Sequence, residues 1–141
     1  MASLLKVDAL TGVTTAGSIS VTGEGNSTTT NLQQGLAKAW CYVEGDAASP
    51  LINSLGGTSL TDSGTGDYTY NLTNNFSYTR YSVTSNESRE PSAPSVGGRI
   101  VQCDGIITSS WGINAYSMNT SAVLSRLDDS VICSTAHGSL A

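Results

Sequence analysis

Apolar and polar residues alternate with a period of two along much of the chain after residue 35. The clearest case runs from Ser59 to Thr73, where two alternating runs flank the turn Asp62–Asp67, made of Asp, Ser, Gly and Thr. Such a turn between alternating runs is typical of a β-hairpin. On the outgoing strand one face carries Tyr68, Tyr70 and Leu72, and the other carries Thr69, Asn71 and Thr73. We therefore predict a hairpin at 59–73 around which the remaining strands are organised.

Shorter alternating runs predict the partners of this hairpin. In the first strand, Ala37, Ala39, Cys41 and Val43 share one face, and Lys38, Trp40, Tyr42 and Glu44 share the other. Further strands are expected at 78–84, 99–107, 111–116 and 131–136. Residues 46–57 are expected to form a loop with a half-strand at Leu51-Ile52, and the helical spacing at 122–127 is too short to predict a helix. Many short strands separated by turn residues indicate an all-β fold, namely a sandwich or barrel of antiparallel strands.

The first 34 residues have a different pattern, because glycines interrupt every apolar run. Ile19–Thr22 is expected to be a short strand, and Asn26–Asn31 a polar connector. This segment cannot bury its own apolar side chains. Either it lies on the domain that follows or it packs against copies of itself, and we favour the second. We predict an extended N-terminal arm at 1–34 and a β-sandwich domain at 35–141, with assembly contacts made by Leu4, Leu5, Val7 and Leu10.

Composition and charge narrow the function classes. The chain has 141 residues, enough for one domain, and only 12% of them are charged. The net charge is -5, and no basic patch of the kind that nucleic acids need is present, so we expect no nucleic-acid partner. The start predicts no secretory leader, and no apolar run is long enough for a membrane span, so we expect no membrane insertion.

Candidate catalytic and metal-binding groups do not converge in the sequence. The chain has one histidine, His137, which we expect to be structural because a metal site needs several ligands at suitable spacing. Turn formation accounts for Asp62 and Asp67 without a bound cation. No spacing selects a catalytic pair among the carboxylates of Glu87, Glu90, Asp104, Asp128 and Asp129. We expect no catalytic residues, no metal and no cofactor.

The three cysteines, Cys41, Cys103 and Cys133, lie in strand-like runs. We expect them to be reduced and buried, and a disulfide between two of them stays open as an alternative.

The longest exposed loop is predicted at 85–98. It contains few apolar residues, and its prolines lower the entropy that a binding loop loses. Its candidate host-recognition residues are Glu87, Arg89, Glu90, Pro91 and Pro94. The alternative is a solvated loop with no partner. Trp40 and Tyr116 are candidate stacking surfaces for sugar rings, or else core side chains.

Several motifs resemble those of small fibre or appendage structural proteins of marine tailed bacteriophages. The resemblance spans nearly the whole chain. It rests on Met1–Asp8 with Thr11-Gly12 and Thr14–Ser18, Thr29–Trp40, Leu60–Asp62, Gly64–Thr69, Tyr116–Ser121, and Val131–Cys133 with Gly138 and Leu140-Ala141. The chain departs from that family at His137, where an aromatic residue is usual, and in residues 85–98.

The resemblance implies a non-enzymatic virion structural protein that is made in the host cytoplasm and resides in the virion. Its domain would be a jelly-roll-like sandwich similar to fibre knobs, assembled as a homotrimer that serves as a fibre or tail appendage in host attachment. The implied partners are the chain itself, other virion proteins, and a host surface glycan or protein. The alternative is a capsid decoration protein, such as a head fibre or cement protein. A glycan-hydrolysing spike is less favoured, because such an enzyme is normally longer, with a repeated β-helix.

Overall fold

The computed structural model describes residues 7, 9–11, 19–22, 29–48, 50–87, 98–119, 121–128 and 131–141. The chain divides into two compact units, Met1–Leu36 and Ala37–Ala141.

The first unit contains a small β-ladder and one helical turn. Strand β1 (Ser20–Thr22) pairs antiparallel with β2 (Thr29–Asn31), and α1 (Leu32–Gly35) follows directly. The short strand expected near residues 19–22 is therefore present. The polar connector expected at 26–31 is wrong at its end, because Thr29–Asn31 pairs with β1 and its threonines suit an extended strand.

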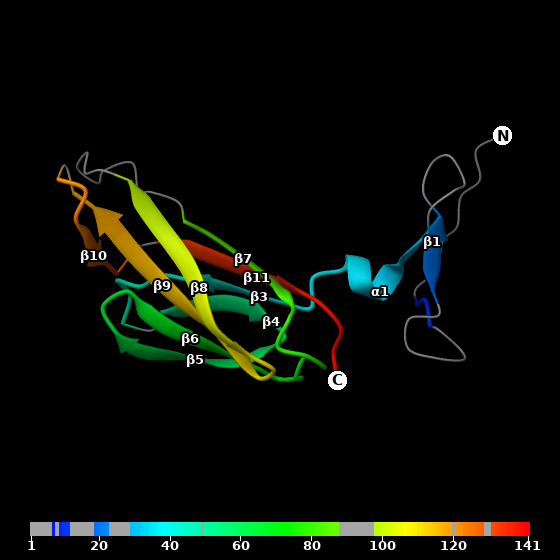
Figure 1. Ribbon diagram of the computed structural model, residues 1–141. Helices are drawn as coiled ribbons and strands as arrows, with labels where there is room; N and C mark the ends of the chain where they lie inside the picture. Colours follow the sequence, from blue (N-terminus) through cyan, green and yellow to red (C-terminus); the bar gives the residue numbers. More distant parts are fainter. Residues whose placement is uncertain are drawn as a thin grey trace. The chain divides into compact units, whose positions relative to one another are not determined.

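The second unit is an antiparallel β-sandwich of two sheets (Figure 1). The four-stranded sheet has the order β4 (Leu51–Leu55), β3 (Ala39–Val43), β11 (Ile132–His137) and β7 (Ser82–Glu87). In the other sheet the order is β10 (Leu124–Arg126), β9 (Ser110–Met118), β6 (Asp67–Leu72) and β5 (Gly57–Gly64), and β8 (Arg99–Ile107) pairs with β9. The predicted all-β sandwich is confirmed, and its jelly-roll-like connectivity stays a prediction.

The inner faces of the two sheets form one hydrophobic core. Alternate residues of each strand point inward, as a period of two requires. The buried members are Ala39, Cys41, Val43, Tyr68, Tyr70, Leu72, Phe76, Trp111, Ile113, Ala115, Ile132 and Ala136. The faces predicted for the 59–73 hairpin and for the strand at 37–44 are confirmed. The rings of Tyr70 and Trp111 lie 4.8 Å apart at the centre of this core.

The strand predicted at 78–84 is displaced toward the C-terminus. The Tyr81 ring stacks on Phe76 at 3.9 Å, and its single hydroxyl proton is shared between the carbonyl oxygens of Ile107 and Ser110, which lie 2.8 and 2.9 Å away. These contacts hold the chain before Ser82 in an irregular path that closes the end of the sandwich. Strand β7 then continues to Glu87, so the loop predicted at 85–98 is wrong over its first three residues, which pair with β11.

The loop predicted at 46–57 is also wrong in its second half, where the half-strand expected at Leu51-Ile52 is present but is only the start of a longer strand. Leu51–Leu55 forms the whole strand β4, and the chain then turns at Gly56 into β5. A Cβ at Gly57 would lie 2.1 Å from the Tyr70 hydroxyl oxygen, so only glycine fits at this corner. The pairing of β4 with β3 shifts register between Tyr42 and Val43, which hides the expected alternation in the sequence.

Candidate functional site

The outer face of the four-stranded sheet carries two rows of side chains across its strands. In one row Trp40 lies between Leu55 on β4 and Thr135 on β11. In the next row Tyr42 lies between Asn53 and Cys133. Because their strand neighbours Cys41 and Val43 point into the core, Trp40 and Tyr42 point to the opposite side of the sheet.

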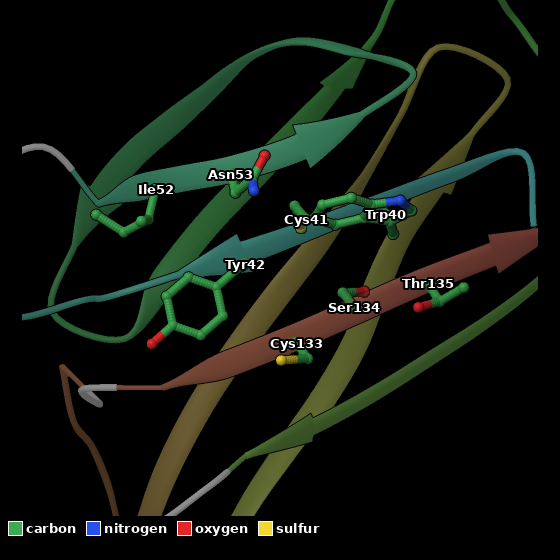
Figure 2. Close-up of a pocket in the computed structure, with 8 residues that line it drawn as sticks. All are labelled: Trp40, Cys41, Tyr42, Ile52, Asn53, Cys133, Ser134 and Thr135. Carbon is green, nitrogen blue, oxygen red and sulfur yellow. The ribbon is translucent and has the colours of Figure 1, made fainter.

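These rows form an open groove, which we call the β3 groove (Figure 2). Its volume is about 410 Å³, within the usual range for ligand sites. Its outer-face lining is Trp40, Tyr42, Ile52, Asn53, Cys133 and Thr135. The groove therefore combines two aromatic rings that are two residues apart with short, uncharged polar side chains.

Hydrogen bonds hold the Tyr42 side chain and the Trp40 backbone in place. The Tyr42 hydroxyl donates to Glu44 Oε1 at 3.1 Å. The carbonyl oxygen of Trp40 accepts a hydrogen bond from the buried Tyr70 hydroxyl at 3.1 Å, and the same hydroxyl lies 3.0 Å from the Leu55 carbonyl oxygen. Tyr70 belongs to the opposite sheet, so the core fixes the backbone beneath the groove.

A chain of polar side chains crosses the sandwich directly below the groove. Ser134 Oγ accepts hydrogen bonds from Trp111 Nε1 at 3.0 Å and from Ser85 Oγ at 2.7 Å. Ser85 Oγ also lies 2.8 Å from Cys103 Sγ. Since the single hydroxyl proton of Ser85 is used on Ser134, the Cys103 thiol is the donor in that contact. These hydrogen bonds tie β11 to β7 and link both strands to β8 and β9 of the opposite sheet, and so help to position Cys133 and Thr135.

Three donor groups of the groove point to a polar ligand. Asn53 Oδ1 accepts a hydrogen bond from the Ser54 amide, which leaves the Nδ2 group as the remaining polar group of that side chain. Within the described part of the chain, no hydrogen-bond partner is recorded for Asn53 Nδ2, Trp40 Nε1 or Thr135 Oγ1. An indole N–H, an amide and a hydroxyl are thus available to a ligand.

The cysteines occupy three different environments. Cys41 is buried under the groove, Cys103 is partly buried and Cys133 is exposed, and all three are free. Burial raises the pKa of the Cys41 thiol from 9.0 to about 12, and the neighbouring Cys133 and Cys103 add to the shift. Cys41 therefore stays protonated. The expectation that all three are buried is wrong for Cys133, because position 133 faces outward next to Tyr42.

Of the two stacking residues named from the sequence, only Trp40 lines the groove. Tyr116 lies on the outer face of the other sheet, where the Arg126 guanidinium sits 5.7 Å from its ring centroid. Arg126 is itself paired with Asp67 at 2.6 Å. The Tyr116 ring is therefore already partly covered by a cation of the same chain.

The other sequence-predicted site residues that the structure describes are Val7, Leu10 and Glu87. Val7 and Leu10 are 56% and 58% exposed in the first unit. Glu87 ends β7 opposite Ile132 and is half-buried. The remaining candidates lie outside the described residues, namely Leu4, Leu5, Arg89, Glu90, Pro91 and Pro94.

The side chains considered for metal binding from the sequence are His137 and the aspartates of the hairpin turn. His137 is exposed at the end of β11, and Asp62 Oδ1 accepts a hydrogen bond from the Gly64 amide within its own turn. Across the described ranges, no group of three or more His, Cys, Asp or Glu side chains is arranged to hold a metal ion. No helix in those ranges has the length and apolar character needed to cross a membrane.

Comparisons with protein-family models, curated proteins and solved structures each find no match to this chain. Flat aromatic rings beside neutral hydrogen-bond donors, on a rigid sheet, are suited to binding a ligand by stacking and hydrogen bonding.

Proposed function

We propose that this chain is a non-enzymatic structural protein of a bacteriophage virion, a homotrimeric fibre or tail appendage that takes part in host attachment. The observation that carries the binding role is the β3 groove, where Trp40 and Tyr42 lie side by side on the outer face of a rigid sheet. The resemblance of the sequence to small phage fibre and appendage proteins supplies the setting.

The first unit is proposed to attach the protein to copies of itself or to the particle. Val7, Leu10 and Val21 are each more than half exposed in the isolated chain. Exposed apolar side chains in so small a unit favour a partner surface that covers them. This supports an assembly role for the segment before residue 37, in a trimer or at a docking site.

A capsid decoration protein is the second candidate. The outer face of the five-stranded sheet also exposes apolar side chains, namely Ile100 and Leu124 at 44% and 50%. Such a face would let the same sandwich lie on a shell surface while the β3 groove stays open. The two candidates differ in position on the particle.

The location is tested by immunogold electron microscopy of purified phage particles, with antibodies raised against residues 37–141. Label on the tail or baseplate is the expected result, label on the head favours decoration, and particles without the protein would contradict the proposal. Purified protein added to host cells before infection should lower phage adsorption. Unchanged adsorption at saturating protein would remove the attachment role.

The oligomeric state is tested separately by light scattering. We expect the full-length chain to have three times the 14.5 kDa mass of one copy. A chain trimmed to residues 37–141 should keep its β-type circular dichroism spectrum and show weaker association. A full-length chain that stays monomeric at micromolar concentration would contradict the trimer.

A further inference from the structure

We infer that the β3 groove binds a neutral glycan, with Trp40 and Tyr42 stacking on successive sugar rings. This inference rests on the proposed attachment function and names the ligand class of its site. Its first support is the arrangement of the rings. Trp40 and Tyr42 are two residues apart on β3, so both side chains stand on the same face of the sheet, one after the other along the strand. A chain of pyranose rings offers apolar C–H faces in the same serial way.

The polar groups around the rings match a ligand rich in hydroxyl groups. Trp40 Nε1, Asn53 Nδ2 and Thr135 Oγ1 are donors without a recorded partner in the described residues, and they come from three adjacent strands. Sugar hydroxyl and ring oxygens accept hydrogen bonds from such groups around the rim, while the ring face stays against the aromatic side chain. The groove is open along the sheet, which suits a linear ligand that continues beyond the site.

Charge argues against the other ligands that stack on aromatic rings. The outer-face lining contains no charged residue, and the chain carries a net charge of -5. Single-stranded nucleic acids also stack on aromatic side chains, but their affinity depends on Lys and Arg contacts to phosphates. Acidic polysaccharides would likewise be repelled by the net negative charge of the chain and would find no Lys or Arg in the groove lining. A neutral ligand is therefore the one that the electrostatics favour.

The groove is also largely preformed. The Tyr42 hydroxyl is held by Glu44, and the Trp40 backbone by Tyr70 from the opposite sheet. A ligand would not have to order a loop on binding, which lowers the entropic cost of association. Weak individual stacking contacts can then add up over several copies in an oligomer.

The test uses the full-length chain with neutral and acidic oligosaccharides. The neutral probes are cellohexaose, maltohexaose, laminarihexaose and mannohexaose, the acidic probe is an alginate hexamer, and decaproline serves as a peptide probe for aromatic grooves. We expect at least one neutral hexamer to bind in calorimetry. Replacing Trp40→Ala should weaken that binding by about tenfold, by analogy with the loss of an aromatic side chain that stacks on a nucleic-acid base.

A matched control is Tyr78→Ala, which removes an aromatic residue that is 73% exposed outside the groove. It should leave binding unchanged, and both variants should keep the circular dichroism spectrum of the parent. Bound hexamer should also slow maleimide labelling of Cys133, the exposed thiol of the groove. Binding that Trp40→Ala does not weaken, binding of only the alginate or decaproline probe, or no binding of any neutral hexamer would overturn the inference.

Two further outcomes separate this inference from the proposed function. If the Trp40→Ala protein blocks phage adsorption as well as the parent does, attachment stands and the groove is not its binding site. If Trp40→Ala lowers the mass measured by light scattering, the groove is an interface between copies, and the glycan inference is rejected.

Discussion

At the scale of single residues, the centre of the sandwich depends on a few polar atoms as well as on apolar packing. Ser134 is 1% exposed and accepts two hydrogen bonds, from Trp111 and from Ser85. In the sequence it is one serine among many, and no pattern marks it. The outward orientation of Trp40 and Tyr42 could be predicted from the sequence. Both share a strand face with the charged Lys38 and Glu44, which identifies that face as solvent-facing.

The role of Ser134 is tested by Ser134→Ala. The variant leaves the buried Trp111 N–H without an acceptor, so we expect the free energy of unfolding to fall by about 1–3 kcal/mol. Urea denaturation followed by tryptophan fluorescence measures the change. The control Ser82→Ala makes the same substitution at an exposed position of β7 and should change stability by less than about 0.5 kcal/mol. Similar losses in the two variants would show that the hydrogen bonds accepted by Ser134 do not contribute to the free energy of unfolding.

The hydroxyl of Tyr81 and the thiol of Cys41 predict how the free energy of unfolding depends on pH in the alkaline range. Burial raises the pKa of Tyr81 from 10.0 to about 12, and that of Cys41 from 9.0 to about 12. The unfolded chain then releases these protons at lower pH than the folded chain, so stability is fully present below pH 9 and is lost as the pH rises toward 12.

Urea midpoints between pH 7 and 11.5 test this alkaline loss. The variant Tyr81→Phe keeps the ring but removes one ionising group. We expect it to be less stable at neutral pH, since two carbonyl oxygens lose their donor, and to show a shallower decline above pH 10. If the urea midpoints of the parent and of Tyr81→Phe fall in parallel above pH 10, Tyr81 is not a source of the alkaline loss of stability.

At the scale of elements, the alternation of apolar and polar residues predicted several strands close to their observed bounds. The strand at 99–107 has the predicted bounds, and those at 111–116 and 131–136 lie within two residues of the observed ones. Strand β4 was predicted only over Leu51-Ile52 because its register shift hides the alternation, and β7 was displaced because long-range contacts of Tyr81 decide where it begins. Pairing of this kind depends on residues far away in the chain, which local patterns do not contain.

The segment after β10 illustrates such a long-range contact. Asp128 Oδ1 accepts hydrogen bonds from the Gly66 amide and the Tyr68 hydroxyl, both at 2.7 Å, and so fastens this segment to the β5–β6 turn. Burial is the largest cause that raises the pKa of the Tyr68 hydroxyl, and the adjacent Asp128 carboxylate raises it further. Helical spacing at 122–127 did not predict this arrangement, and β10 forms instead by pairing with the end of β9.

The contact is tested by Asp128→Ala, which leaves two buried donors without an acceptor. We expect a loss of about 1–3 kcal/mol in the free energy of unfolding. The matched control is Asp62→Ala, which removes a carboxylate that accepts from Gly64 at the exposed end of the same hairpin. That variant should lose about 0.5 kcal/mol or less. Equal losses would mean that burial of the contact contributes nothing.

At the scale of the whole molecule, the sandwich provides a rigid support for the β3 groove. The all-β class followed from the sequence, because short alternating runs recur between turn residues. The groove could not be predicted from the sequence, because it needs Asn53 on β4 and Thr135 on β11 beside β3. These two residues are more than 80 positions apart in the chain. The candidate loop lies largely beyond the described residues, so recognition by that loop stays a prediction beside the groove.

The central claim is that a neutral glycan binds at Trp40. The chain has two tryptophans, so a ¹H–¹⁵N spectrum contains two indole signals, which Trp40→Phe assigns. On titration with the neutral hexamer that binds best, the Trp40 indole signal should shift progressively. The Trp111 signal should stay in place, because its N–H is buried and bonded to Ser134. A Trp40 signal that does not move at saturating ligand, or equal shifts of both signals, would contradict the account.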